Sequence, residues 1–149
     1  MIEISMYQPD IPQNVGAMMR LCACTGIKLN IIEPCGFPWN ERKIAQAGMD
    51  YIKHVSIEKH ISWEHYNKYR KKGSRIILMS AHASLPYTNF EFQDCDILLA
   101  GRESAGVPED IHQSADALIC IPMIGACRSL NIVNATSMIL GEALRQTGK

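Results

Sequence analysis

The segment DILLAGRESAGVP, residues 96–108, decides the fold class because it joins a buried strand directly to a loop with a glycine at each end. ILLA is a short apolar run of the kind found in strands that are covered on both faces of a parallel sheet. Gly101 and Gly106 bracket the loop, so its backbone can approach a ligand without a Cβ in the way. The segment therefore predicts a ligand-binding loop at the carboxyl end of a buried strand.

The loop GRESAGVP does not match three common motifs. A P-loop continues from glycine to lysine, whereas Val107 follows Gly106, and this excludes P-loop kinase or ATPase chemistry. A serine-hydrolase elbow needs a glycine two residues before its serine, where this chain has Arg102 before Ser104. The dinucleotide-binding fingerprint lacks its second glycine. Taken alone, the loop is equally compatible with a purely structural turn.

The remaining chain alternates between strand-like and helical segments. Strand patterns predict strands at residues 2–7, 29–32, 51–57, 75–81, 96–101 and 117–122. Helical periodicity predicts helices at residues 15–26, 41–48, 62–73, 108–114 and 127–146. Asn14 is expected to cap the first helix, Gly26 to end it, and Ser62 to open the third. This alternation predicts an α/β fold with one mostly parallel sheet and helices on both faces.

Length and composition fit one soluble domain, residues 1–149. Hydrophobic residues make up 47% of the chain and charged residues 20%, without a low-complexity tract. The first ten residues lack a basic leader, and the chain has no run of the ~18 apolar residues that a membrane helix needs. We therefore expect a cytoplasmic protein with no membrane segment.

Charge and cysteine usage exclude two further classes of protein. Fifteen basic residues balance fifteen acidic ones, which excludes a strongly basic protein that coats nucleic acid. The dense cationic run KYRKK, residues 68–72, is typical of a solvated helix face. The six cysteines contain no C-x-x-C pair and the five histidines no ligand spacing, so we expect reduced thiols and no metal site.

Polar residues gather where strands are expected to end. In parallel sheets ligands bind beyond the carboxyl ends of the strands, which here are followed by SAHASLP (80–86), GRESAG (101–106) and MIGACRSLN (123–131). A second polar group, PQNVG (12–16), precedes Arg20 at the start of a helix, where free N–H groups favour anions. Helix caps and a solvated arginine are the alternative explanation of these residues.

Together, three of these segments resemble, in order and spacing, the signature motifs of the SpoU-type 2′-O-ribose RNA methyltransferases of the SPOUT superfamily. The segments are PQNVGAMMRLCACTG (12–26), GRESAGVP (101–108) and IPMIGACRSLNIVNATSMILGEALRQ (121–146). The chain is most similar to the small subfamily that modifies the wobble nucleotide of leucine tRNAs. The stretch IEPCGFPWNERKIAQAGMDY (32–51) also resembles that subfamily.

The resemblance implies a C-terminal trefoil knot, which no periodicity argument would propose because knotted chains are rare. It also implies S-adenosylmethionine as cofactor, bound in the loops of the knot largely by backbone groups. Cofactor contacts are expected at Met79, Gly101, Ile121, Ser129 and Leu130.

The resemblance assigns catalysis to Arg20, with Asn14 and Glu103 positioning it and the loops. Arg128 and Asn131 are expected to lie across the cleft near the RNA. A guanidinium with a pKa above about 12 is a poor base, so we expect Arg20 to bind phosphate and orient the ribose 2′-hydroxyl.

Members of this family are homodimers whose active site uses both chains. The final helix is apolar around most of its girth, which suits burial on more than one side. Two copies would combine local basic patches from Arg20, Arg42, Lys43 and Arg128 into one anion-binding surface. Relatives usually carry a tyrosine where this chain has Gly141, a departure that is expected to alter dimer packing or substrate contact. A methyltransferase for another RNA site and a non-catalytic RNA-binding protein remain the alternative hypotheses.

Overall fold

Six parallel strands form one sheet in the order β3-β2-β1-β5-β4-β6. The computed structural model describes residues 1–149, apart from the side chains of residues 48 and 49. The strands are β1 (Glu3–Tyr7), β2 (Lys28–Ile32), β3 (Ile57–His60), β4 (Ile76–Met79), β5 (Ile97–Ala100) and β6 (Ala117–Ile119). The α-helices are α1 (Pro12–Thr25), α2 (Glu41–Gly48), α3 (Trp63–Tyr69), α4 (Glu109–Ser114) and α5 (Ile132–Thr147). The predicted α/β class and parallel sheet are confirmed.

The register brings the carboxyl ends of the central strands together. Ala100 at the end of β5 is paired with Met6 of β1 on one side and with Met79 of β4 on the other. The loops that follow these three strands therefore leave the sheet at one edge. The same edge was the expected place for a ligand.

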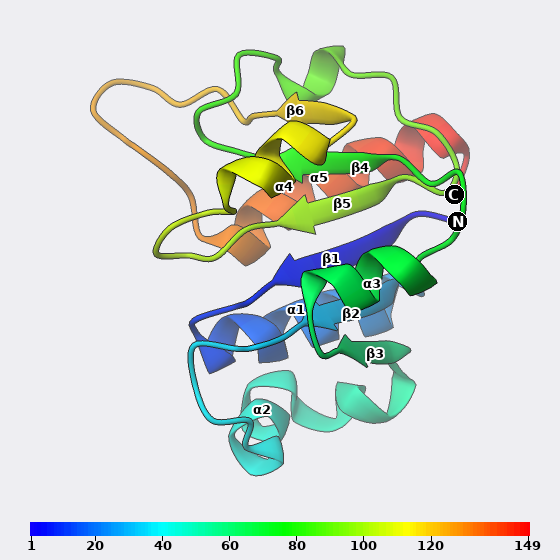
Figure 1. Ribbon diagram of the computed structural model, residues 1–149, viewed down its shortest axis with the longest axis vertical. Helices are drawn as coiled ribbons and strands as arrows, with labels where there is room; N and C mark the ends of the chain where they lie inside the picture. Colours follow the sequence, from blue (N-terminus) through cyan, green and yellow to red (C-terminus); the bar gives the residue numbers. More distant parts are fainter.

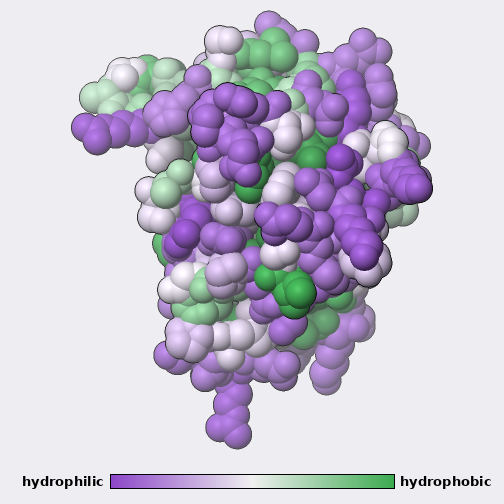
Figure 2. Space-filling model, viewed as in Figure 1, coloured by the Kyte–Doolittle hydropathy of each residue, from purple (hydrophilic) through white to green (hydrophobic). Residues whose placement is uncertain are grey.

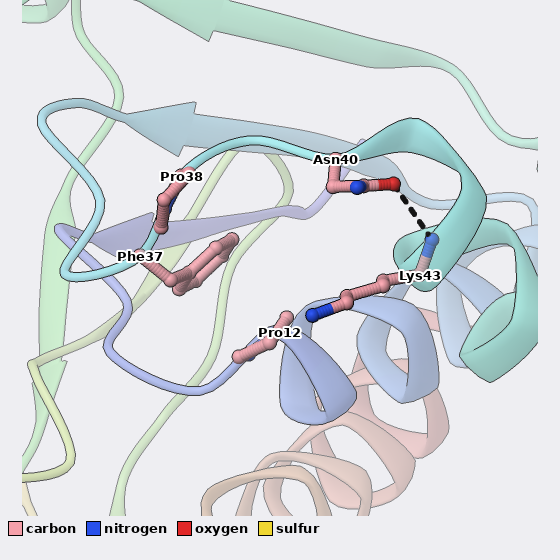
Figure 3. A pocket seen from close by; sticks show the side chains of 5 residues that line it. All are labelled: Pro12, Phe37, Pro38, Asn40 and Lys43. Atoms are coloured by element: carbon pink, nitrogen blue, oxygen red, sulfur yellow. Dashed lines mark hydrogen bonds between the residues drawn. The ribbon is translucent and has the colours of Figure 1, made fainter.

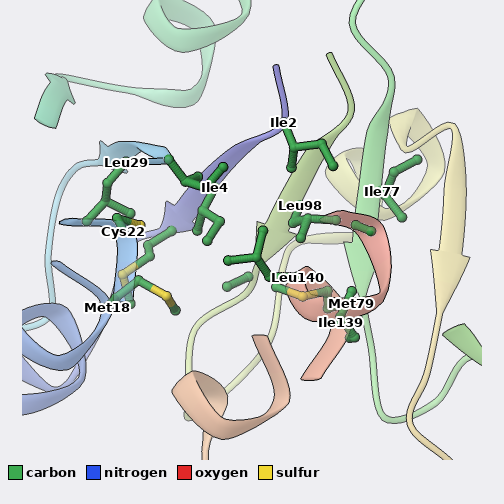
Figure 4. Close-up of a cluster of buried hydrophobic side chains, with 14 of the residues drawn as sticks. Ile2, Ile4, Met18, Cys22, Leu29, Ile77, Met79, Leu98, Ile139 and Leu140 are labelled. Carbon is green, nitrogen blue, oxygen red and sulfur yellow. The ribbon is translucent and has the colours of Figure 1, made fainter. Parts of the chain in front are cut away.

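Helices cover both faces of the sheet, as the buried strand patterns require. Figure 1 shows α3 and α4 in front of the sheet and α1 and α5 behind it, with α2 beside α1 at the β3 end. On the α1 and α5 side, strand residues such as Ile4 and Leu98 pack on Met18 and Leu140. Figure 4 shows this cluster with Ile2, Ile4, Met18, Cys22, Leu29, Ile77, Met79, Leu98, Ile139 and Leu140 labelled. Alternate strand residues, including Leu99, face the smaller cluster under α3 and α4.

Helix α1 begins earlier than the sequence pattern predicts. Its N-cap is Ile11 and Pro12 is the first helical residue, so Asn14 lies inside the first turn and the prediction that it caps the helix was wrong. Proline suits this place because its ring fixes a helical φ and it has no N–H that needs a partner. Gly26 ends the helix in the left-handed conformation, with φ 69°, as predicted.

Two other predicted boundaries were wrong. The segment 51–57 was predicted as a strand, but Met49–His54 form a 3-10 helix and β3 begins only at Ile57. Ile52 and Val55 pack against the core there, so packing overrides the alternating pattern. The last helix begins at Ile132 rather than at Cys127, because the side chain of Asn131 caps it by accepting from two backbone N–H groups.

Ser62 caps α3 as predicted, but this helix ends at Tyr69. Most of the run KYRKK therefore lies in the following turn, where Lys71 donates to Cys95 Sγ at 2.9 Å. Cys95 precedes β5 and Lys71 precedes β4. The run thus lies at the amino edge of the sheet, away from the loops expected to bind ligand.

No helix in the described part of the chain is both long enough and apolar enough to cross a membrane. Among the described residues, no three His, Cys, Asp or Glu side chains are grouped so that they could hold a metal ion. The strand order does not decide whether the chain is knotted, so the trefoil knot stays a prediction.

Candidate active site

The loop after β5 is a tight turn that needs both of its glycines. Arg102 and Gly106 exchange two backbone hydrogen bonds, of 2.9 and 2.8 Å. A Cβ on Gly101 would lie 2.8 Å from the backbone of Gly106, closer than real contacts allow. Gly106 itself has φ +65°, a conformation that side chains disfavour. The sequence prediction was that a ligand approaches this backbone closely, whereas the group that approaches Gly101 within the chain is the Gly106 backbone of the same loop.

Asp10, in the loop after β1, fastens this turn to the neighbouring strand. Its Oδ2 accepts from the backbone N and the Oγ of Ser104, at 3.1 and 2.5 Å, and its Oδ1 accepts from Arg102 at 2.9 Å. The hydrogen bond from the Ser104 hydroxyl and then that from Arg102 lower the pKa of Asp10 to about 2. Asp10 is thus a carboxylate at neutral pH and holds the loop as an anion.

Sequence reasoning missed Asp10. The residue lies in QPD, an ordinary turn sequence. The available signal was its place directly after a strand whose carboxyl end meets that of β5. That signal depends on the strand order, which spacing along the chain does not give.

Glu103, Asn14 and Asn131 form a chain of hydrogen bonds that joins three distant segments. Glu103 Oε2 accepts from the backbone N of Asp10 at 2.7 Å, and its Oε1 accepts from Asn14 Nδ2 at 3.1 Å. Asn14 Oδ1 in turn accepts from Asn131 Nδ2 at 3.0 Å. The structure therefore brings three of the residues predicted for the site into direct contact. We call Asp10, Asn14, Glu103 and Asn131 the inner network.

Asn131 has two structural roles at once. Its Oδ1 caps α5 by accepting from Val133 N at 2.8 Å, while its Nδ2 donates to Asn14. The cap explanation of this residue is therefore correct, and its predicted place near the RNA stays a prediction. Because both the oxygen and the nitrogen of its amide are hydrogen-bonded, Asn131 holds the start of α5 against the start of α1.

Arg20 lies farther along α1, on the exposed surface. Its guanidinium lies over the ring of Tyr51, 4.9 Å from the ring centre. Six helical residues separate it from Asn14, which corresponds to about 9 Å along the axis and a different face of the helix. The inner network therefore belongs to one side of α1, and Arg20 belongs to another.

The residues predicted to contact the cofactor lie on the loops after β4, β5 and β6. Met79 is buried at the end of β4, whereas Ile121 is half-buried after β6. Backbone hydrogen bonds from Tyr87 to Cys120 and from Cys120 to Leu85 hold the loop after β4 against β6. Gly101 follows β5, which lies on the other side of β4 from β6 in the sheet order. The five predicted positions thus share one edge of the sheet.

The loop between β6 and α5 projects from the rest of the chain. Figure 1 shows this loop at the upper left, and Figure 2 shows mostly apolar surface at the same place. Ile124 is 89% exposed and Leu130 is 41% exposed, while Arg128 and Ser129 are exposed beside them. Apolar side chains next to a glycine turn fit a ligand with a flat aromatic ring such as adenine.

Comparison with known proteins identifies the family. The model of the SpoU rRNA methylase family matches residues 1–141. The chain belongs to the SpoU methylase family. This confirms the resemblance that the three motifs indicated. The protein is therefore a methyltransferase, not a P-loop enzyme or a serine hydrolase.

Relatives match over nearly the whole chain. The tRNA (cytidine(34)-2′-O)-methyltransferase of Beijerinckia indica is 53% identical over 146 residues, which are 97% of this chain and 91% of that protein. The protein of the same name from Escherichia coli K12 is 35% identical and covers 99% and 95%. A solved structure described as "Structural insights into the 2-OH methylation of C/U34 on tRNA" superposes with a TM-score of 0.92 at 36% identity, covering 97% of this chain and 95% of the other.

Proposed function

We propose that this chain, as a single domain, transfers a methyl group from S-adenosylmethionine to the ribose 2′-hydroxyl of the wobble nucleotide, position 34, of tRNA. Leucine tRNAs are the proposed substrates because the motif resemblance is to enzymes that act on them. The observation that carries the proposal is the inner network, in which Asn14, Glu103 and Asn131 meet beside the Gly101 turn. Relatives named for this reaction at up to 53% identity support it.

The cofactor is proposed to bind at the loops after β4, β5 and β6. Gly101 begins the loop after β5, Met79 ends the adjacent strand β4, and Ile121 follows β6 beyond it. Ser129 and Leu130 close the site from the projecting loop. When bound, S-adenosylmethionine supplies an electrophilic methyl carbon on a positively charged sulfur. No metal is needed for this transfer.

The chain's own residues then bind and orient the ribose. A 2′-hydroxyl is a poor nucleophile near neutral pH, so its oxygen must be held in line with the methyl carbon and its proton must be polarised or removed. Arg20 is proposed to bind the adjacent phosphate and orient this hydroxyl, with Arg128 contacting RNA across the cleft. Asn14 and Glu103 are positioning residues, because they hold the start of α1 against the loop after β5. Asn131 supports the RNA side of the cleft from the start of α5.

A homodimer is proposed as the active form, with the site completed across two chains. Arg20 lies on a different face of α1 from the inner network, so a second copy is needed to bring an Arg20 to it. Leu130 and Met138 are 41% and 44% exposed at the start of α5 and along it, which suits an interface. A tRNA substrate is in keeping with the cytoplasmic location expected from the sequence.

The decisive experiment is incubation with labelled S-adenosylmethionine and unmodified leucine tRNAs, followed by mapping of the modified nucleoside. Methylation at position 34 is the expected result. Transfer to a different RNA or position would overturn the subfamily assignment and leave the reaction type. Absence of cofactor binding in calorimetry would overturn the enzymatic proposal in favour of a non-catalytic RNA-binding protein.

A further inference from the structure

A cavity of about 270 Å³ lies outside the loops assigned to the cofactor. It is formed where the start of α1 faces the connection between β2 and α2, and it is lined by Pro12, Phe37, Pro38, Asn40 and Lys43. Figure 3 shows the Phe37 ring facing this space and the Lys43 ammonium beside Pro12. The cavity therefore combines flat apolar walls with a cation.

The apolar wall is held in place by its own contacts. Phe37 stacks on Trp39 at 6.5 Å between ring centres, and Lys59 lies 4.5 Å from the centre of the Trp39 ring. Gly36 N donates to Pro9 O at 2.9 Å, and a Cβ on Gly36 would collide with Asp10. The loop that carries Phe37 is thus fixed to the loop after β1. This aromatic surface exists before any ligand arrives, so little ordering cost accompanies stacking on it.

The polar groups of the cavity are donors. Asn40 Oδ1 accepts from the backbone N of Arg42 and of Lys43, which leaves its amide nitrogen to donate. The Lys43 ammonium adds a positive charge, and Arg42 is exposed beside it. The nearby carboxylate of Asp10 is already engaged by Arg102 and Ser104. Glu41, exposed in the first turn of α2, carries the opposite charge beside these cations.

A cation and an amide donor beside a flat aromatic wall suit a nucleotide, whose base stacks and whose phosphate accepts. Pro12 lies two residues before Asn14 on α1, about 3 Å along the helix axis. The cavity therefore adjoins the inner network. It is separated from the projecting loop, since α2 and that loop lie at opposite ends of the molecule (Figure 1).

We propose that this cavity binds a nucleotide of the RNA substrate next to the one that is methylated, with its base on Phe37 and its phosphate at Lys43. This inference rests on the proposed function, because it requires an RNA substrate at the inner network. It adds a base-stacking site at Phe37 to the residues assigned to catalysis, cofactor and RNA from the resemblance, and gives the Lys43 of the expected anion-binding surface a specific phosphate. Discrimination between RNA substrates would then begin before the ribose reaches the cofactor.

The first test replaces the cation. Lys43→Gln is expected to raise KM for tRNA about tenfold, with kcat and cofactor affinity unchanged. It should also lower the slope of binding against salt concentration by about 0.7 to 0.9, the contribution of one phosphate contact. Lys72→Gln, at the amino edge of the sheet, is the matched control and should leave both quantities unchanged.

The second test pairs the ring with the base. An abasic nucleotide on one side of the target should raise KM for the wild-type protein on the order of tenfold, as expected for one lost stacking contact. For the Phe37→Leu variant, the same abasic RNA should raise KM almost no further, because the variant and the abasic site remove the same interaction. Thermal unfolding of Phe37→Leu verifies that the variant is folded.

The outcomes separate this inference from the proposed function. If the wild-type protein methylates tRNA while Lys43→Gln keeps the wild-type KM and salt slope, the nucleotide site is wrong and the function stands. Additive effects of Phe37→Leu and both flanking abasic positions would also overturn the site. If the wild-type protein neither binds nor methylates any tRNA, the proposed function fails first.

Discussion

The inner network and the projecting loop lie at the same edge of the sheet but are built in opposite ways. In the inner network every polar side chain already has a partner within the chain, and Asn14 is 8% exposed. In the loop between β6 and α5, Ile124 is 89% exposed and Arg128 and Ser129 face solvent. The hydrogen bonds of the inner network are therefore complete within a single chain, while the side chains of the projecting loop are exposed and open to a ligand or a second chain.

This difference separates two kinds of site residue. Residues of the inner network act on the ligands by fixing the backbone around them, so their loss should reduce stability as well as activity. Exposed residues such as Arg20 and Arg128 contribute little to folding, so their loss should reduce activity alone. Measuring both quantities on the same variants tests this division directly.

The largest effect is expected for Arg20→Ala. Loss of a group that orients the 2′-hydroxyl should reduce methyl transfer by about 10²- to 10⁴-fold. The free energy of unfolding should change by less than about 1 kcal/mol, because Arg20 is exposed on the surface of α1. Single-turnover transfer and urea unfolding measure the two quantities.

Arg20→Lys is the informative partner of that variant. Lysine keeps the charge but loses the planar fork of donors, so it should restore part of the RNA affinity without restoring the rate. Equal loss of transfer and of cofactor affinity in Arg20→Ala would instead move this residue into the cofactor site.

Glu103→Ala should reduce both stability and activity. It leaves the N–H of Asp10 and the amide of Asn14 without their acceptor, which costs about 1–3 kcal/mol of stability. Activity should fall with it because the loop after β5 is released. Glu103→Gln, which retains one acceptor oxygen for two donors, should lie between Ala and wild type. A fully stable but inactive Glu103→Ala protein would contradict the positioning role and imply direct contact with substrate.

Gly101→Ala tests the glycine turn. Its Cβ would lie 2.8 Å from the Gly106 backbone, and relieving such overpacking costs about 1–3 kcal/mol. Cofactor affinity, measured by calorimetry, should fall as the turn shifts.

The matched control for this variant is Gly141→Ala. A Cβ at Gly141, in the exposed interior of α5, would meet nothing within 4 Å. Alanine should therefore raise the free energy of unfolding by about 0.5–1 kcal/mol through helix propensity. Destabilisation by both substitutions to a similar degree would mean that the contact with Gly106 does not matter.

The smallest effect is expected from the titration of Asp10. Its pKa in the folded chain is about 2, below the value of roughly 4 in an unfolded chain, so the unfolded state binds the proton more tightly. The stabilisation from the carboxylate is thus fully present above about pH 4 and is lost as the pH falls toward 2. The difference in urea midpoint between wild type and Asp10→Asn should be constant from pH 7 to 5 and shrink below pH 4.

Ser104→Ala provides the corresponding control. The Ser104 hydroxyl is the largest cause of the lowered pKa, so its removal should shift the carboxyl titration of Asp10 upward in NMR. If the pKa of Asp10 does not change in Ser104→Ala, Arg102 rather than Ser104 is the main cause of its lowering.

The sheet and its functional edge were predictable because their signals are local. Buried runs such as ILLA and the glycines of GRESAG report strand burial and a tight turn without reference to the rest of the chain. The first turns of α1 and α5 were harder, since Pro12 and Asn131 set their starts through geometry that polar spacing does not encode. The 3-10 helix at Met49–His54 was missed because packing on α1 outweighs an alternating pattern.

The partners within the site could not be predicted from spacing. Asp10 meets Ser104 across 94 residues of sequence, and Asn14 meets Asn131 across 117. Which of several polar residues at an edge become neighbours depends on the strand order. The cavity beside Lys43 was invisible for the same reason, because it exists only where α1 faces the loop after β2.

The long reach of the bond between Asn14 and Asn131 also sets the order in which the protein becomes functional. During synthesis Asn14 leaves the ribosome early, whereas its partner Asn131 is made 117 residues later. A chain that stops before α5 lacks both this bond and the core residues Ile139, Leu140 and Ala143. Unfinished chains are therefore expected to be inactive on RNA, because activity begins only when α5 packs against the sheet.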